Sequence, residues 1–122
     1  MAEHPVVHIE FASSDPRASS KFFADVFGWN IVHNEEFDYT MFDAPPGPGG
    51  AFPRVDGETY NPGDVLVFIG TDDIEGTLAR IEAAGGKTIA PKMEVPSMGW
   101  FAIFSDPTGN RLALWKSMQP QG

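Results

Sequence analysis

Residues 6–11 alternate between polar and apolar side chains, and several of them are β-branched, which predicts a half-buried strand. His8 and Glu10 share one face of this strand. The opposite, apolar face holds Val7, Ile9 and Phe11.

Two later segments have helical periodicity, and each lies between an Asp and a Gly 13 residues further on. Asp15 followed by Pro16 predicts an N-cap and first helical residue, and Gly28 predicts the end of a helix running to about residue 27. Asp72, with an acidic residue three positions later, predicts a second helix that ends at Gly85. The expected apolar stripes are Ala18, Phe22, Phe23, Val26 and Phe27 in the first helix and Ile74, Leu78 and Ile81 in the second.

The order of elements repeats, because each half of the chain shows a strand, a helix and three further strands. The later strands are expected near residues 29–33, 39–42 and 51–54 in the first half, and near 87–90, 100–104 and 111–115 after a strand at 65–69 in the second. We therefore predict a single α+β domain over residues 1–122, with one βαβββ module at about 6–54, a linker at 55–63 and a second module at 64–116. Two such modules in one curved mixed sheet would leave an open cup opposite the helices, where ligands commonly bind.

Composition narrows the function classes. With 17 acidic and 8 basic residues the formal charge is −9, which argues against nucleic-acid and membrane partners. The chain has no cysteine, which excludes disulfides and thiolate chemistry and favours a cytoplasmic location. No apolar run is long enough to span a bilayer, and the polar Met1–Pro5 does not fit a signal peptide.

Several motifs together resemble the vicinal oxygen chelate superfamily, which includes glyoxalase I, bleomycin-resistance proteins and extradiol dioxygenases. They are His8-Ile9-Glu10, Asp15-Pro16 at a helix start, the run from Phe22 to Trp29, and the run from Gly99 through Asp106-Pro107-Thr108-Gly109-Asn110 to Trp115. The resemblance covers residues 6–116. It implies paired βαβββ modules, often a homodimer, and in the enzymes one divalent metal held in the cup by His, Glu or Gln, which polarises two neighbouring substrate oxygens.

At the ligand positions that the resemblance implies, this chain keeps only one donor. His8 lies at the position on the first strand, whereas the matching positions hold Leu66 and Ala113, and the fourth falls near Ala51-Phe52. One imidazole is too few ligands for a useful metal site. We therefore expect no complete metal site and no cofactor, and we favour a binding protein over an enzyme.

The leading hypothesis is a homodimeric protein that binds a small, partly apolar molecule in the cup. An alternative is a lyase, isomerase or dioxygenase that uses a non-standard metal site or metal-free acid–base chemistry, with His8 and Glu10 as the catalytic candidates. A third possibility is a structural protein whose cup is filled by its own aromatic side chains. The candidate ligand-binding residues are His8, Glu10, Phe42, Phe52, Leu66, Phe68, Trp100, Phe104, Arg111 and Trp115.

Overall fold

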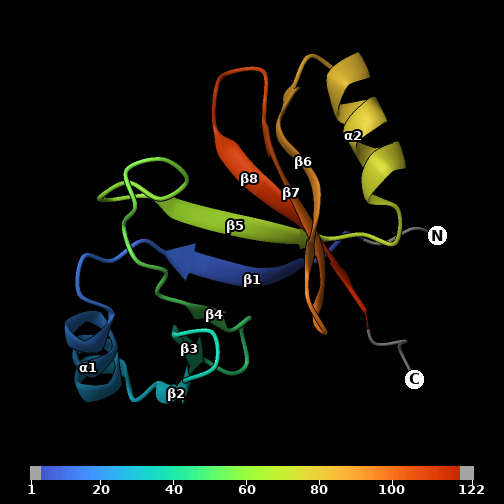
Figure 1. The fold of residues 1–122 in the computed structure, drawn as a ribbon. Helices are drawn as coiled ribbons and strands as arrows, with labels where there is room; N and C mark the ends of the chain where they lie inside the picture. Colours follow the sequence, from blue (N-terminus) through green and yellow to red (C-terminus); the bar gives the residue numbers. More distant parts are fainter. Residues whose placement is uncertain (1–3, 119–122) are drawn as a thin grey trace. The chain divides into compact units, whose positions relative to one another are not determined.

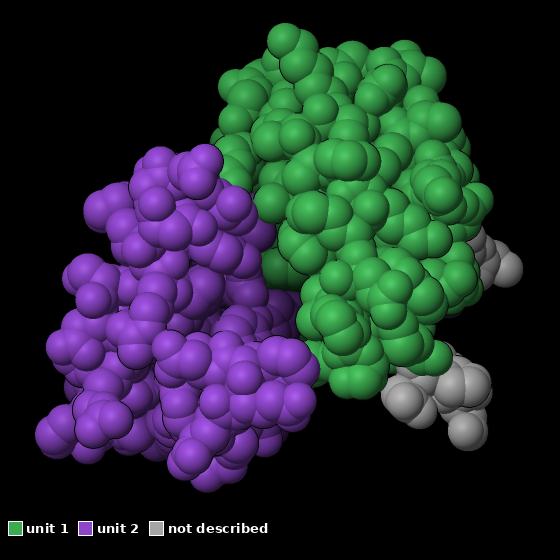
Figure 2. Space-filling view, in the orientation of Figure 1, with its two compact units in different colours: residues 1–7, 67–122 green, residues 8–66 purple. Residues whose placement is uncertain are grey.

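The computed structural model describes residues 4–118, so Met1–Glu3, part of the segment judged unlike a signal peptide, lie outside it. Its two helices and eight strands fall into two compact units (Figures 1 and 2). Unit 1 comprises Met1–Val7 and Val67–Gly122, and unit 2 comprises His8–Leu66. No helix within residues 4–118 is long and apolar enough to cross a membrane.

Unit 2 contains one helix packed on a small mixed sheet. Its strands are hydrogen-bonded in the order β2-β3-β4-β1, with β4 parallel to β1 and the other pairs antiparallel. The elements are β1 (Val6–Phe11, whose first two residues belong to unit 1), α1 (Pro16–Phe27), β2 (Asn30–Asn34), β3 (Tyr39–Asp43) and β4 (Gly50–Ala51).

Unit 1 repeats this plan. Its strands run in the order β5-β8-β7-β6, with β8 parallel to β5 and the remaining pairs antiparallel. The elements are β5 (Val65–Gly70, which starts in unit 2), α2 (Ile74–Ala83), β6 (Lys87–Val95), β7 (Gly99–Ser105) and β8 (Arg111–Ser117). The predicted α+β class with two βαβββ modules is confirmed, although β4 is shorter than expected and β6 longer.

The predicted ends of α1 are confirmed, but only Phe23 of its predicted large apolar stripe packs into the core. The Asp15 carboxylate accepts a hydrogen bond from the backbone of Ala18, and Gly28 takes the left-handed conformation with φ +73°. The helix buries Pro16 and Ser20 instead of its largest side chains. Phe23 also packs toward the sheet, where its ring stacks on Phe11, whereas Phe22, Val26 and Phe27 are exposed.

The start of α2 lies one residue later than predicted. Asp73, not Asp72, is the N-cap and accepts from the backbone of Gly76, and the last turn closes at Ala84 before Gly85 with φ +100°. The two N-caps are therefore 58 residues apart rather than 57.

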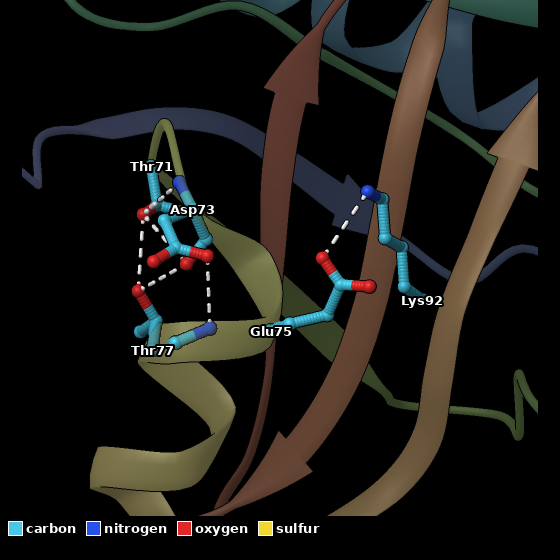
Figure 3. Close-up of polar contacts among 6 residues, drawn as sticks. Thr71, Asp73, Glu75, Thr77 and Lys92 are labelled. Carbon is cyan, nitrogen blue, oxygen red and sulfur yellow. Dashed lines mark hydrogen bonds and ion pairs between the residues drawn. The ribbon is translucent and has the colours of Figure 1, made fainter.

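This offset of 58 reveals a matched pair of helix starts. In unit 2 the Ser13 hydroxyl accepts from the backbone of Asp15 at 3.0 Å and hydrogen-bonds the Ser19 hydroxyl at 2.7 Å. In unit 1 Thr71, Asp73 and Thr77 make the same two contacts at 3.1 and 3.0 Å (Figure 3). The residues that begin each helix therefore preserve the internal repeat.

The two units differ in their cores. In unit 2 aromatic rings stack between α1 and the sheet, for example Trp29 against Phe42 with centroids 4.4 Å apart and against Phe23 at 4.8 Å. In unit 1 the core beneath α2 is mostly aliphatic. It is formed by Ile74, Leu78, Ala102, Phe104 and Leu114.

Gly50 is required where β4 meets β1. Ile9 pairs with Gly50, and a Cβ at that glycine would overlap the carbonyl oxygen of Ile9. Glycine therefore lets the two parallel strands approach, and it sets β4 beside the strand that carries His8 and Glu10.

Candidate functional site

Glu10 is a buried carboxylate in unit 2. Its residue is only 4% exposed, on the face of β1 opposite the aromatic core. The Tyr39 hydroxyl donates a hydrogen bond to Oε2, and the Tyr60 hydroxyl donates one to Oε1. Burying a carboxylate is costly unless such donors compensate for lost water, so the two tyrosines make this position possible.

Tyr39 lies at the start of β3 and is held in its neutral form. Burial raises the pKa of its hydroxyl well above the usual value, and the negative charge and hydrogen bond of Glu10 raise this pKa further. The hydroxyl therefore remains a hydrogen-bond donor throughout the physiological pH range.

His8 extends the chain of polar contacts from Glu10. Its Nε2 lies 2.9 Å from the Tyr39 hydroxyl oxygen and 3.6 Å from Oε2 of Glu10. Because the single hydroxyl proton of Tyr39 is donated to Glu10, this oxygen accepts from His8, which places a proton on Nε2. In the neutral imidazole Nδ1 is then the acceptor atom.

Tyr60 comes from the segment expected to be a linker. The Asp56 carboxylate accepts from the backbone of Glu58 at 2.9 Å and of Tyr60 at 2.8 Å, forming a compact turn. These backbone hydrogen bonds lower the pKa of the Asp56 carboxyl. The segment is therefore a structured loop that places the Tyr60 hydroxyl against the Glu10 carboxylate.

We call His8, Glu10, Tyr39 and Tyr60 the Glu10 cluster. The chain has only two tyrosines, and both donate to the same carboxylate. Exposure falls along the cluster, since the side chain of His8 is 28% exposed and that of Glu10 only 5%. The cluster is thus a saturated buried anion linked to a partly exposed imidazole.

The structure brings His8 and Glu10 together but places Phe42 and Phe52 on the other side of the unit 2 sheet. Both rings stack with Phe11, at centroid distances of 5.8 and 6.1 Å, and Phe52 also stacks with Phe23 of α1 at 5.5 Å. These two residues therefore belong to the core beneath α1, not to the face that carries the Glu10 cluster.

Trp100 and Phe104 are corrected in the same way. Phe104 belongs to the core beneath α2, and Trp100 packs against that core. Alternation along β7 places Phe101 and Ile103 on the opposite face, where they pair with Trp115 and Ala113. The alternation along β7 was predicted correctly, but the wrong set of residues was assigned to the cup. Only the packing of β7 against α2 shows which face of the strand lies under the helix.

The other four candidates stay predictions as ligand contacts. Leu66 and Phe68 are buried in β5. Arg111 and Trp115 are partly buried on β8 and alternate with Leu112 and Leu114, which pack toward α2 as expected.

The residues present do not fit the metal centre that the family pattern implies. Leu66 and Ala113 are buried apolar residues, and both oxygens of Glu10 are engaged by tyrosines. Among residues 4–118 no group of three or more His, Cys, Asp or Glu side chains could hold a metal ion. A lone imidazole beside a saturated carboxylate falls short of the three or four ligands such ions take.

Comparison with known proteins identifies the class. Residues 6–114 match the model of the Glyoxalase/Bleomycin resistance protein/Dioxygenase superfamily. The chain belongs to this superfamily, so the resemblance drawn from its motifs is confirmed.

One curated relative is the anthracycline biosynthesis protein DnrV of Streptomyces peucetius, which is 30% identical over 93% of this chain and 47% of its own length. The chain therefore spans about half the length of the curated relatives it matches.

Solved structures of low identity share the fold alone. Methylmalonyl-CoA epimerase from Mycobacterium tuberculosis superposes with a TM-score of 0.69 at 14% identity, covering 96% of this chain and 89% of that one. A superfamily member from Vibrio splendidus 12B01 gives 0.66 at 17% identity, with coverage of 93% and 99%.

Proposed function

We propose that this protein binds a small, partly apolar molecule without a metal ion, and that the Glu10 cluster supplies the polar contact to it. The observation that carries this proposal is the saturated Glu10 carboxylate with a partly exposed His8 linked to it through Tyr39. A carboxylate with both oxygens occupied is poorly placed to ligate a metal. An imidazole held in one orientation is well placed to make a directional hydrogen bond.

The relatives suggest which probes to use first. DnrV is named for anthracycline biosynthesis, and an anthracycline combines fused aromatic rings with hydroxyl and carbonyl groups. Such a molecule matches the requirement for a mainly apolar ligand with a few hydrogen-bonding atoms.

The test is a calorimetric titration of an anthracycline and of a smaller hydroxylated quinone into the wild type and three variants. His8→Ala should weaken binding about tenfold, the effect of losing one hydrogen bond of about 1.4 kcal/mol. Tyr39→Phe should weaken it less, because the imidazole remains but loses its anchor. His33→Ala is the matched control, since this second imidazole of unit 2 hydrogen-bonds Thr40 away from the Glu10 cluster and should not affect affinity.

Two results would contradict the proposal. One is an affinity that His8→Ala and His33→Ala change equally. The other is stoichiometric, micromolar binding of Ni²⁺, Zn²⁺, Mn²⁺ or Fe²⁺ by chelator-treated protein, because the donor set described above would then be incomplete.

A second candidate function is metal-free acid–base catalysis. Two hydrogen bonds in series link the Nε2–H of His8 to the Tyr39 hydroxyl and this hydroxyl to the Glu10 carboxylate. They would hold the imidazole in one tautomer and stabilise the imidazolium formed when His8 takes a proton from a substrate. Catalysis would be distinguished from binding by turnover that His8→Ala abolishes and His33→Ala leaves intact. Proton exchange at a carbon beside a carbonyl, followed by NMR in D₂O, is the direct assay.

A further inference from the structure

The two tyrosines that donate to Glu10 are held in different ways. Tyr39 lies in β3, where its backbone pairs with Asn34 of β2, and its hydroxyl also accepts a hydrogen bond from His8. Tyr60 lies in the loop at residues 55–64, between β4 and β5. A strand and a second side chain therefore fix the hydroxyl of Tyr39, whereas the position of the Tyr60 hydroxyl depends on how the loop is placed.

This loop is a self-contained segment of unit 2 with fixed ends. Backbone hydrogen bonds of 3.0 Å join Val55 and Asp64 to residues 12–13, which follow β1. Between these ends, the Asp56 carboxylate holds residues 56–60 together as one turn. Most of the intervening residues are exposed, namely Asp56, Gly57, Glu58, Pro62 and Gly63. Exposed loops open at lower free energy than paired strands, so Tyr60 can leave Glu10 while Tyr39 stays in place.

A phenol from solution would replace Tyr60 with little net change in hydrogen bonding. When the Tyr60 hydroxyl leaves Oε1 of Glu10, it exposes a carboxylate oxygen at the end of a space the size of a phenol ring. A neutral hydroxyl on an aromatic ring fills this space and restores the hydrogen bond, so the buried charge keeps two donors.

An acidic ligand fits the same space poorly. A carboxylate or a phosphate would bring a second negative charge beside the buried Glu10, which costs free energy in proportion to their closeness. The loop adds Asp56, Glu58 and Asp64 and contains no basic residue. The surroundings of Oε1 therefore favour a neutral hydrogen-bond donor over an anion.

We propose that Tyr60 occupies the position of a phenolic hydroxyl of the ligand, and that the ligand binds by exchanging with Tyr60 on the Glu10 carboxylate. This inference rests on the proposed function and adds to it the chemical class of the ligand, a neutral aromatic hydroxyl. Tyr60 is then a specificity-determining residue, because its hydroxyl competes with the ligand and only another donor can replace it. Tyr39 keeps its hydrogen bond to Oε2 throughout.

The test is a calorimetric titration of three matched probes, which are β-naphthol, its methyl ether and β-naphthoate. The wild type should bind β-naphthol most tightly and β-naphthoate about tenfold more weakly. Tyr60→Phe should bind β-naphthol about tenfold more tightly than the wild type, because the competing hydroxyl is gone, and should bind the methyl ether as the wild type does. Tyr39→Phe is the matched control, because it deletes the same hydroxyl at the other oxygen and should weaken binding instead.

A second measurement uses the wild type alone, so it does not depend on how any variant folds. Amide hydrogen exchange of residues 56–60 should become faster when β-naphthol binds, because the ligand releases the loop from Glu10. The methyl ether should leave this exchange rate unchanged. Slower exchange with β-naphthol would mean that the loop closes over the ligand, which would overturn the proposal.

The outcomes separate this exchange from the function on which it rests. The exchange is overturned if Tyr60→Phe and the wild type bind β-naphthol equally, or if β-naphthoate binds as tightly as β-naphthol. Binding that His8→Ala weakens would still support the proposed function. Tighter binding by Tyr60→Phe without any effect of His8→Ala would support the exchange and overturn the role of His8. If neither protein binds any of the three probes, the exchange is overturned, and the anthracycline titration decides the proposed function by itself.

Discussion

Units 1 and 2 share the same arrangement of one helix and four strands, but different side chains occupy the equivalent positions. With the offset of 58 residues between N-caps, His8 corresponds to Leu66 and Glu10 to Phe68. Strand β5 places two buried apolar residues where β1 places an imidazole and a carboxylate. The comparison shows that the fold does not require the Glu10 cluster, because the same strand position accepts a phenyl ring. The cost of burying a charge in unit 2 therefore points to a role in function.

Phe68→Ala should produce the largest loss of stability. It changes the apolar residue of β5 that corresponds to Glu10 of β1. Deleting a buried phenyl ring removes hydrophobic burial and leaves a cavity, which together cost about 3–5 kcal/mol. Urea unfolding at pH 6 and pH 8 should give the same loss, since no ionisable group is removed. A loss that differs strongly between the two pH values would contradict a purely apolar role.

Glu10→Gln should destabilise the protein by about 2 kcal/mol. The amide is nearly isosteric, but it replaces two charge-assisted hydrogen bonds with weaker ones and turns a donor toward a tyrosine hydroxyl. The measurement is urea unfolding at pH 7. Glu35→Gln, in the exposed turn after β2, is the control and should stay within about 0.5 kcal/mol of the wild type.

Tyr39→Phe should remove part of the sensitivity of the fold to alkaline pH. Because the pKa of Tyr39 is raised on folding, the native state holds this proton after the unfolded chain has released it at about pH 10. Stability from this group is therefore complete below pH 10 and falls above it, by at most about 1.4 kcal/mol per pH unit. Denaturant midpoints between pH 8 and pH 11 should show a shallower decline for the variant. Equal slopes would show that Tyr39 does not retain its proton.

Asp15→Ala and Asp73→Ala should each cost about 1 kcal/mol, because each removes an N-cap at an equivalent position of the repeat. Thermal or urea unfolding measures both. Asp72→Ala is the control, since Asp72 was the expected cap but the structure gives that role to its neighbour. A larger loss for Asp72→Ala than for Asp73→Ala would restore the original prediction.

The smallest effect is expected for Asp106, which organises the turn between β7 and β8 as Asp56 organises the loop of unit 2. Hydrogen bonds from Asn110 and Thr108 lower the pKa of the Asp106 carboxyl. Stability from this group is present above the unfolded pKa near 3.9 and is lost as the pH falls below it. Asp106→Asn should therefore make acid unfolding between pH 4 and pH 2 slightly less steep. An unchanged acid transition would show that the turn does not depend on the charge.

Local patterns predicted much of the fold. Alternation identified β1 and placed His8 with Glu10, and Asp15 and Gly28 set both ends of α1. The start of α2 was misplaced because Asp72 and Asp73 both offer a capping carboxylate, and only the Thr71 and Thr77 hydroxyls distinguish them.

The candidate site was predicted less well. Period-two alternation gives two faces without saying which one meets the helix, so Phe42, Phe52, Trp100 and Phe104 were assigned to the wrong side. Tyr60 was missed because its segment has no periodicity, although Asp56-Gly57 is a recognisable turn and tyrosine is rare in this chain.

Each unit is closed by a parallel pair between its first and last strands, since Glu10 pairs with Ala51 and Phe68 with Ala113. Parallel partners so far apart in sequence meet only after the chain between them has collapsed, whereas hairpins such as β2–β3 can form locally. The Glu10 cluster spans β1, β3 and the loop at residue 60, so it is assembled at this late closure. During synthesis, a growing chain that ends before residue 60 carries Glu10 without its second tyrosine, so this carboxylate gains its second hydrogen-bond donor only once that loop has emerged.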